Sequence, residues 1–202
     1  MPSVFTSHRP GFRWRPRRQL ALHQRPPRVL HTWLDDGGSL TARLVALSEG
    51  QFRVEVLQQY LALPSREEQQ ALGMARPSRA LIREVILMGC NQPWVFARSV
   101  LPLSSLSGRL RHLRKQRNRP LGAFLFSQPQ LERSPIAVAA FNTHDGYLPA
   151  SIPCPYPLWG RRSIFALDGK PLLVSEVFLP ALCDQLLSNA SNHPNHRLII
   201  GL

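Results

Sequence analysis

The sequence predicts an α+β domain in which helices pack on one face of a mainly antiparallel sheet. Two observations predict it: apolar strand segments come in pairs joined by short turns, and short helical segments lie between these pairs. A third observation is length, because 202 residues suit one domain better than two.

The first elements follow from periodicity. Apolar residues recur at helical spacing between Trp33 and Ser48, where Ser39 is a candidate N-cap. Residues 52–56 alternate apolar and polar side chains and predict a half-buried strand. The polar connection 64–79 that follows is expected to hold one helical turn near residues 67–72.

The next pair of strands is more apolar. Residues 80–90 are apolar on both faces of a strand, which predicts a strand buried on both sides within its sheet. The turn at 91–93 leads into a second strand, 94–100, so the pair reads as a hairpin. Residues 103–119 are expected to be helical, and Pro120 opens another short apolar helix.

The last part of the chain contains a second hairpin. Residues 136–141 predict a strand, and the proline-rich stretch 143–157 predicts a long irregular loop. Residues 161–180 predict two strands joined at Asp168-Gly169, a common hairpin dipeptide. The polar segment 184–202 carries no clear structural signal.

The charge of the chain is concentrated in two segments. The formal net charge is +13. Residues 1–30 hold seven arginines and residues 109–119 hold six Arg and Lys, with no acid in either, so the rest of the chain is neutral. We expect a basic, poorly ordered arm over 1–30, a folded domain over 31–182 and a tail over 183–202.

These features exclude several functional classes. Neither basic segment brings a module that reads nucleic acid, and no apolar run is long enough to span a membrane. The three cysteines, Cys90, Cys154 and Cys183, are widely spaced and are expected to be free thiols in the cytoplasm. His193 and His196 lack a third ligand, so we expect no metal site, and we expect a monomer.

Two charged residues stand on otherwise apolar strand faces. Arg83 shares its face with Leu81 and Val85, and Glu176 shares its own with Val174. An ionised group in such a place is costly unless it is paired or bound. The two residues therefore either form a structural ion pair, or lie at strand ends that reach water, or bind a small carboxylate that carries a hydroxyl. Glu84 and Arg98, on the neighbouring faces, are expected to pair structurally.

The order of the motifs resembles the bacterial chorismate lyase family. WLDDGGSLT, LIREVIL, QPWVFARSVLPLSSLSG, RPLGAFLF and LWGRRSIFALDGKPLLVSEVFLP occur in this order across residues 33–180. The resemblance implies a cofactor-free lyase that converts chorismate to 4-hydroxybenzoate and pyruvate, the first committed step of ubiquinone biosynthesis. It also implies a buried, lidded active site that releases its product slowly.

The resemblance assigns roles to four residues. Arg83 corresponds to the family's ligand-holding arginine and Glu176 to its active-site glutamate, while Leu40 and Leu121 correspond to two further substrate-binding positions. We expect the backbone of the two leucines to matter more than their side chains. Glu176 is expected to hydrogen-bond the ring hydroxyl, to assist proton transfer and to have a pKa raised by burial.

Three other arginines are weaker candidates. Arg98 is a candidate for the second carboxylate of chorismate, while Arg161 and Arg162 are candidates for guiding anions inward. The basic run 109–119 precedes Leu121 and is expected to attract a dianion. The alternative function is a non-catalytic domain that senses aromatic carboxylates, because similar folds serve as effector domains of transcription regulators.

Overall fold

The computed structural model describes residues 12–192 and shows one antiparallel sheet of seven strands. The strand order is β1-β2-β3-β7-β6-β4, and β5 pairs with β6 beside β4. The strands are β1 (Phe52–Ala62), β2 (Ala80–Gly89), β3 (Gln92–Pro102), β4 (Glu132–Arg133), β5 (Ala137–Phe141), β6 (Leu158–Leu167) and β7 (Lys170–Phe178). The predicted α+β class is confirmed, and both predicted hairpins, β2–β3 and β6–β7, are present.

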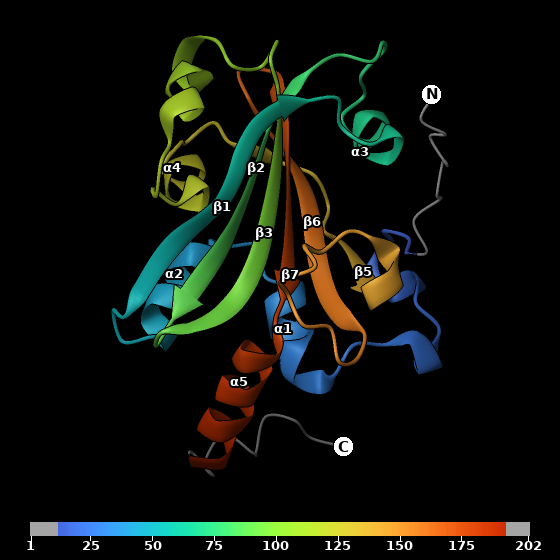
Figure 1. Cartoon of the computed structure of the whole chain (residues 1–202), viewed down its shortest axis with the longest axis vertical. Coiled ribbons are helices and arrows are strands. Elements are labelled where there is room, and N and C mark those ends of the chain that lie inside the picture. Colours follow the sequence, from blue (N-terminus) through green and yellow to red (C-terminus); the bar gives the residue numbers. More distant parts are fainter. Residues whose placement is uncertain (1–11, 193–202) are drawn as a thin grey trace.

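The helices are short and most of them lie on one side of the sheet. Figure 1 shows α2 and α4 on one side of the sheet and α3 on the other. The helices are α1 (His31–Leu34), α2 (Leu40–Leu47), α3 (Arg66–Ala71), α4 (Leu121–Phe126) and α5 (Pro180–Asn192). The predicted N-cap of α2 is confirmed, because the Ser39 hydroxyl accepts the amide of Ala42. No helix in the described part of the chain is long and apolar enough to cross a membrane.

A row of polar residues divides the core on the side of α2 and α4, which we call the helix face. One apolar cluster on this face contains Val85, Leu87, Val95, Trp159 and Phe178. The other lies toward the opposite ends of the same strands and contains Leu81, Leu101, Phe165, Leu167 and Leu172. Between the clusters the strands place the polar side chains of Arg83, Ser99, Glu176, Arg161 and Ser163.

The basic arm is only partly as expected. Residues 12–30 lie against the domain: Phe12 is buried, and Arg15 exchanges two backbone hydrogen bonds with Val138 of β5, at 3.0 and 2.7 Å. An aromatic cluster fixes this segment, because Phe12 packs on the ring of Phe141. Residues 1–11 lie outside the described part of the chain.

Two further segments differ from their expected form. The basic run forms a 3-10 helix, η4 (Gly108–Lys115), which buries Leu110 and Leu113 against the sheet. The expected tail beginning at residue 183 instead continues α5, which packs near β3. Its apolar residues Leu182 and Leu186 join the core. His193 and His196 lie outside the described residues.

Candidate active site

Arg83 is a buried guanidinium without a carboxylate partner in the described structure. It projects from β2 and is 4% exposed. Its Nη2 donates to the carbonyl oxygens of Arg117, at 2.7 Å, and Arg119, at 3.3 Å. Its Nε is buried and has no acceptor among the described residues. Burial lowers the pKa of this guanidinium, so the site would gain from an anion.

Glu176 has a different environment, because it is held by a second buried arginine. Arg161 lies directly across from it on β6 and donates from Nε to Glu176 Oε2 at 2.7 Å. Arg161 is 1% exposed, and its Nη1 also donates to the carbonyl oxygens of Trp33, at 2.7 Å, and Asp36, at 2.8 Å. The carboxylate is therefore fixed through Oε2, and Oε1 has no hydrogen-bond partner within residues 12–192.

Arg83 and Glu176 are not partners of each other. Arg83 faces Ser99 on β3 and Glu176 faces Ala97 on the same strand, so both lie on the helix face, two strands apart and offset by two residues. Strand spacing and rise place their Cα atoms about 12 Å apart. The structural ion pair between them, an alternative open from the sequence, is therefore wrong.

The two predicted leucine positions lie at helix starts that meet above this face. Leu40 is the first residue of α2, and Leu121 is the first residue of α4. The two helices pack together so closely that a Cβ on Gly122 would lie 3.0 Å from Thr41 Oγ1. The first amides of a helix have no partner within it. Leu40 and Leu121 are themselves buried.

The loops before these helices are tied to the charged row. The carbonyls that accept from Arg83 belong to residues 117 and 119, immediately before α4. The carbonyls that accept from Arg161 belong to residues 33 and 36, shortly before α2. Hydrogen bonds therefore link Arg83 to the segment before Leu121, and link Glu176, through Arg161, to the segment before Leu40.

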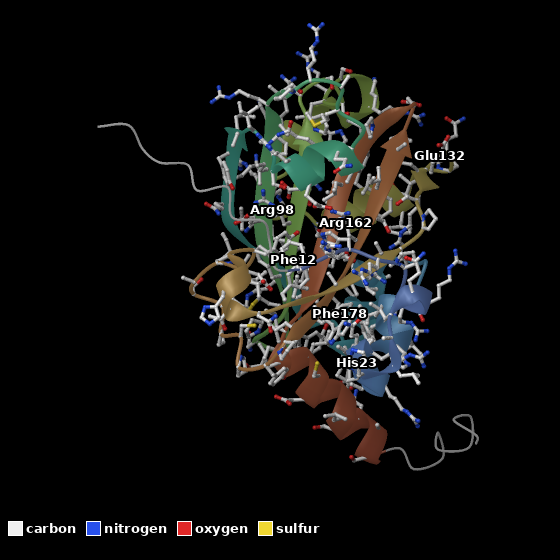
Figure 2. All side chains as sticks on the ribbon, turned by 90° about the vertical axis from the view of Figure 1, so that its right-hand side faces the viewer. Phe12, His23, Arg98, Glu132, Arg162 and Phe178 are labelled. Carbon is white, nitrogen blue, oxygen red and sulfur yellow. The ribbon has the colours of Figure 1, made fainter. Side chains whose placement is uncertain are left out.

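Arg98 lies on the opposite face of the sheet, so its candidacy for the second carboxylate is wrong. It is paired with Glu68 of α3, at 2.7 Å from Nε, and with Glu84, its expected partner. The hydrogen bonds and charge of Glu68 outweigh burial and raise the pKa of Arg98. Figure 2 shows Arg98 and Arg162 together beside α3.

The expected guiding role of Arg161 and Arg162 is also wrong. Arg161 is buried, and its guanidinium is paired with the Glu176 carboxylate. Arg162 points to the other face, where it pairs with Glu67 at 2.5 Å and lies over the ring of Trp14. Neither guanidinium faces solvent, as a charge that attracts the substrate from solution would.

Arg133, which no sequence pattern singled out, contributes a further guanidinium to the helix face. Its Nε donates to the Ser163 hydroxyl at 2.9 Å, and its Nη1 donates to the Gly37 carbonyl at 2.7 Å. It comes from β4, a strand of two residues that gives no periodic signal. The charges of Arg161 and Glu176 are close enough to affect its pKa.

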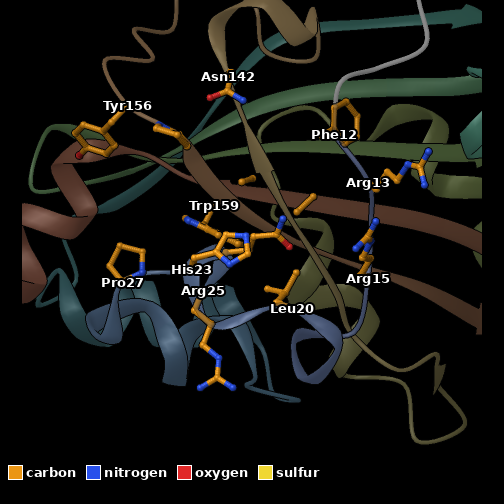
Figure 3. Close-up of a pocket in the computed structure, with 14 residues that line it drawn as sticks. Phe12, Arg13, Arg15, Leu20, His23, Arg25, Pro27, Asn142, Tyr156 and Trp159 are labelled. Atoms are coloured by element: carbon orange, nitrogen blue, oxygen red, sulfur yellow. The ribbon is translucent and has the colours of Figure 1, made fainter.

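A separate pocket lies between the arm and β5. It has a volume of about 730 Å³ and includes Arg13, His23 and Trp159 in its lining (Figure 3). Neither Arg83 nor Glu176 lines it. The chemistry predicted from the sequence therefore lies under the helices and not in this open pocket.

A guanidinium buried without a counter-ion among residues 12–192, a fixed carboxylate on the same sheet face and two helix starts above them form the candidate site of an enzyme. The model of the family described as chorismate lyase matches residues 12–188. A probable chorismate pyruvate-lyase of Aromatoleum aromaticum is 43% identical over 172 residues, which cover 80% of this chain and 92% of the relative. One from Pseudomonas aeruginosa is 45% identical over 159 residues, which cover 79% of this chain and 87% of the relative. The chain belongs to the chorismate lyase family.

The fold is shared more widely than the family. The effector domain of PhnF from Mycobacterium smegmatis has a TM-score of 0.52 at 15% identity, over 71% of this chain and 90% of that chain. This likeness concerns the fold alone.

Proposed function

We propose that this protein converts chorismate to 4-hydroxybenzoate and pyruvate as the first committed step of ubiquinone biosynthesis. The observation that carries the proposal is Arg83, whose Nε is buried without an acceptor on the same sheet face as Glu176. The names of relatives with more than 40% identity support the same activity.

Arg83 binds the ring carboxylate of the substrate in this proposal. A guanidinium binds a carboxylate through two parallel charge-assisted hydrogen bonds, and the free Nε of Arg83 supplies one donor of such a pair. The amides of Leu40 and Leu121, at the starts of α2 and α4, are suited to the same anion. This is how two apolar residues serve as binding positions.

Glu176 binds the ring hydroxyl at the other end. A carboxylate is only an acceptor of hydrogen bonds, and Arg161 occupies Oε2. Oε1 is therefore the atom that accepts a hydrogen bond from the ring hydroxyl. The pairing also fixes the direction of the carboxylate, so the ring is oriented before the reaction begins.

The reaction needs orientation more than it needs a strong base. The ring C–O bond of the enolpyruvyl ether breaks, and the neighbouring ring carbon that carries the hydroxyl loses its proton. The electron pair of that C–H bond completes the aromatic ring, and the leaving enolate gains one proton to become pyruvate. No oxidant or water is consumed, so burial and positioning are the main contributions of the protein.

The product keeps the groups that Arg83 and Glu176 bind. 4-Hydroxybenzoate retains both the carboxylate and the hydroxyl, so it should bind well and inhibit the enzyme. Release of the product also requires the segment around Arg117 and Arg119 to move, because the carbonyl oxygens of these residues accept hydrogen bonds from Arg83.

The test is to mix the purified full chain with chorismate and to follow 4-hydroxybenzoate and pyruvate. Equal amounts of the two products are expected, with turnover lost in Arg83→Ala. Binding of chorismate without turnover would support the effector-type alternative instead.

A further inference from the structure

Two guanidiniums on the helix face lack a carboxylate partner in the described part of the chain. They are Arg83 and Arg133, whereas Arg161 on the same face is paired with Glu176. Burial lowers the pKa of both unpaired guanidiniums, and the charge of Arg161 lowers that of Arg133 further, against the smaller opposing effects of the Glu176 and Asp36 carboxylates. An unpaired cation in such surroundings is costly, which points to an anion that the protein itself does not supply.

The charge balance of this face matches a dianion. Arg83, Arg133 and Arg161 face one carboxylate, that of Glu176, which leaves a surplus of two positive charges. The nearby carboxylate of Asp36 does not change this surplus, because it is paired with Arg43 at 3.1 Å. A monoanion would leave one of the two guanidiniums uncompensated.

Arg133 is held rigidly in its place. Its Nε and Nη1 are bound by the Ser163 hydroxyl and the Gly37 carbonyl, and its guanidinium lies 5.1 Å from the centre of the Phe165 ring and 5.8 Å from that of Phe126. Its Nη2 has no acceptor among the residues that the structure describes. A fixed planar fork with a free donor is suited to binding a carboxylate in one orientation.

The order of strands places Arg133 on the side of Glu176 away from Arg83. Arg83 lies on β2, Glu176 on β7, Arg161 on β6 and Arg133 on β4, in that order across the sheet. In chorismate the ring carboxylate is at one end, and the hydroxyl and the enolpyruvyl ether are on neighbouring carbons at the other. With the carboxylate on Arg83 and the hydroxyl on Glu176, the second carboxylate extends beyond Glu176 toward β6 and β4.

We propose that Arg133 binds the carboxylate of the enolpyruvyl side chain and so distinguishes the dianionic substrate from the monoanionic product. This inference rests on the proposed function. Arg133 then contacts the part of the substrate that leaves as pyruvate, whereas Arg83 contacts the part that stays. The two arginines should consequently have different effects on substrate and product.

The test compares two aromatic ligands that cannot react. One is 4-hydroxybenzoate, and the other is 3-(1-carboxyvinyloxy)-4-hydroxybenzoate, which carries the same enolpyruvyl ether on a ring that is already aromatic. In Arg133→Gln we expect the dissociation constant of the second ligand to rise by about tenfold or more, as for a lost charged hydrogen bond. That of 4-hydroxybenzoate should stay within about twofold, because it makes no contact with Arg133. KM for chorismate should rise as well.

The matched control is Arg43→Gln made in an Asp36→Asn background, so that both charges of this ion pair are removed together and the surplus on the helix face is unchanged. Arg43 also holds the loop before α2, through the Thr32 carbonyl and Asp36, but its charge is neutralised by that carboxylate. A loosened loop would therefore affect both variants and both ligands alike. Arg133→Lys keeps the positive charge but loses the planar pair of guanidinium donors. We expect it to weaken binding of the dianionic analogue less than Arg133→Gln does. It also serves as the test if Arg133→Gln does not fold.

The outcomes separate this inference from the proposed function. Equal weakening of both ligands in the Arg133 variants, or a selective loss in the control variant, would overturn the role of Arg133. A wild-type protein that binds the dianionic analogue more tightly than 4-hydroxybenzoate but does not convert chorismate would overturn the proposed function and leave the role of Arg133 standing.

Discussion

Arg161 and Glu176 face each other on β6 and β7 and are joined by one hydrogen bond of 2.7 Å within the polar row between the two apolar clusters. We expect Arg161→Met to destabilise the protein by about 3 kcal/mol, since it leaves a carboxylate that is only 18% exposed without its partner. The double variant Arg161→Met, Glu176→Gln should recover much of this loss. A double-mutant cycle in urea measures the coupling, and additive effects would contradict the pairing.

Arg83→Met should separate stability from activity. Arg83 has no carboxylate partner in the described structure, so removing its charge should leave the melting temperature unchanged or raise it. The affinity for 4-hydroxybenzoate should fall by about tenfold or more, because a charged hydrogen bond is lost. Thermal unfolding and ligand titration check the two effects. A large fall in melting temperature would mean that Arg83 is primarily structural.

Gly160→Ala should disturb the strand that carries Arg161. A Cβ at this position would lie 2.8 Å from the Glu176 carbonyl oxygen and 3.0 Å from the ring of Phe141. We expect a loss of about 1–3 kcal/mol in the free energy of unfolding. Gly37→Ala is the control, because a Cβ there meets nothing within 4 Å. Similar stabilities of the two variants would show that the close packing at Gly160 is relieved at little cost.

Glu68 should contribute stability that depends on pH. Burial raises the pKa of Glu68, but hydrogen bonds and the charge of Arg98 outweigh it, so its pKa in the folded protein is lowered. A lowered pKa gives stability above the unfolded value, about 4.3, that is lost as the pH falls through the folded value. Glu68→Gln should therefore be less stable than the wild type at pH 7, and the difference should shrink below about pH 4. A difference that is constant between pH 7 and pH 3 would contradict this linkage.

The basic run should affect how fast substrate arrives. Arg109 is paired with Asp168, whereas Arg111, Arg114 and Lys115 have no carboxylate partner in the part of the chain described. We expect kcat/KM to fall as salt rises, because salt screens attraction over distances beyond about 10 Å. The triple variant with glutamine at these three positions should show a flatter dependence. If kcat/KM depends on salt identically in the wild type and the triple variant, the basic run has no role in attracting the substrate.

Part of the site was predictable from local signals. The alternation of side chains along each strand identified Arg83 and Glu176 as charged residues on apolar faces. Both residues lie on the helix face. The Arg161–Glu176 pair could also have been found, since the turn at Asp168 and Gly169 fixes the register in which these residues face each other.

The remaining features depend on long-range contacts that no local pattern encodes. Arg133 enters the site from a strand of two residues, and its partner Gly37 lies 96 residues away in the chain. The arm was expected to be poorly ordered because its prolines and arginines lack periodicity. Residues 12–30 of the arm are instead held by contacts with distant parts of the chain, such as the isolated β-bridge between Arg15 and Val138.

The polar row leaves the core on the helix face in two parts, with Val85 and Trp159 in one cluster and Leu81 and Phe165 in the other. An aromatic ring lying between Arg83 and Glu176 would touch both parts and join them into one continuous interior. In that sense the ligand takes the place of a core side chain that the sequence omits. Binding of the ligand would then stabilise the folded state by mass action, so the melting temperature should rise with ligand concentration.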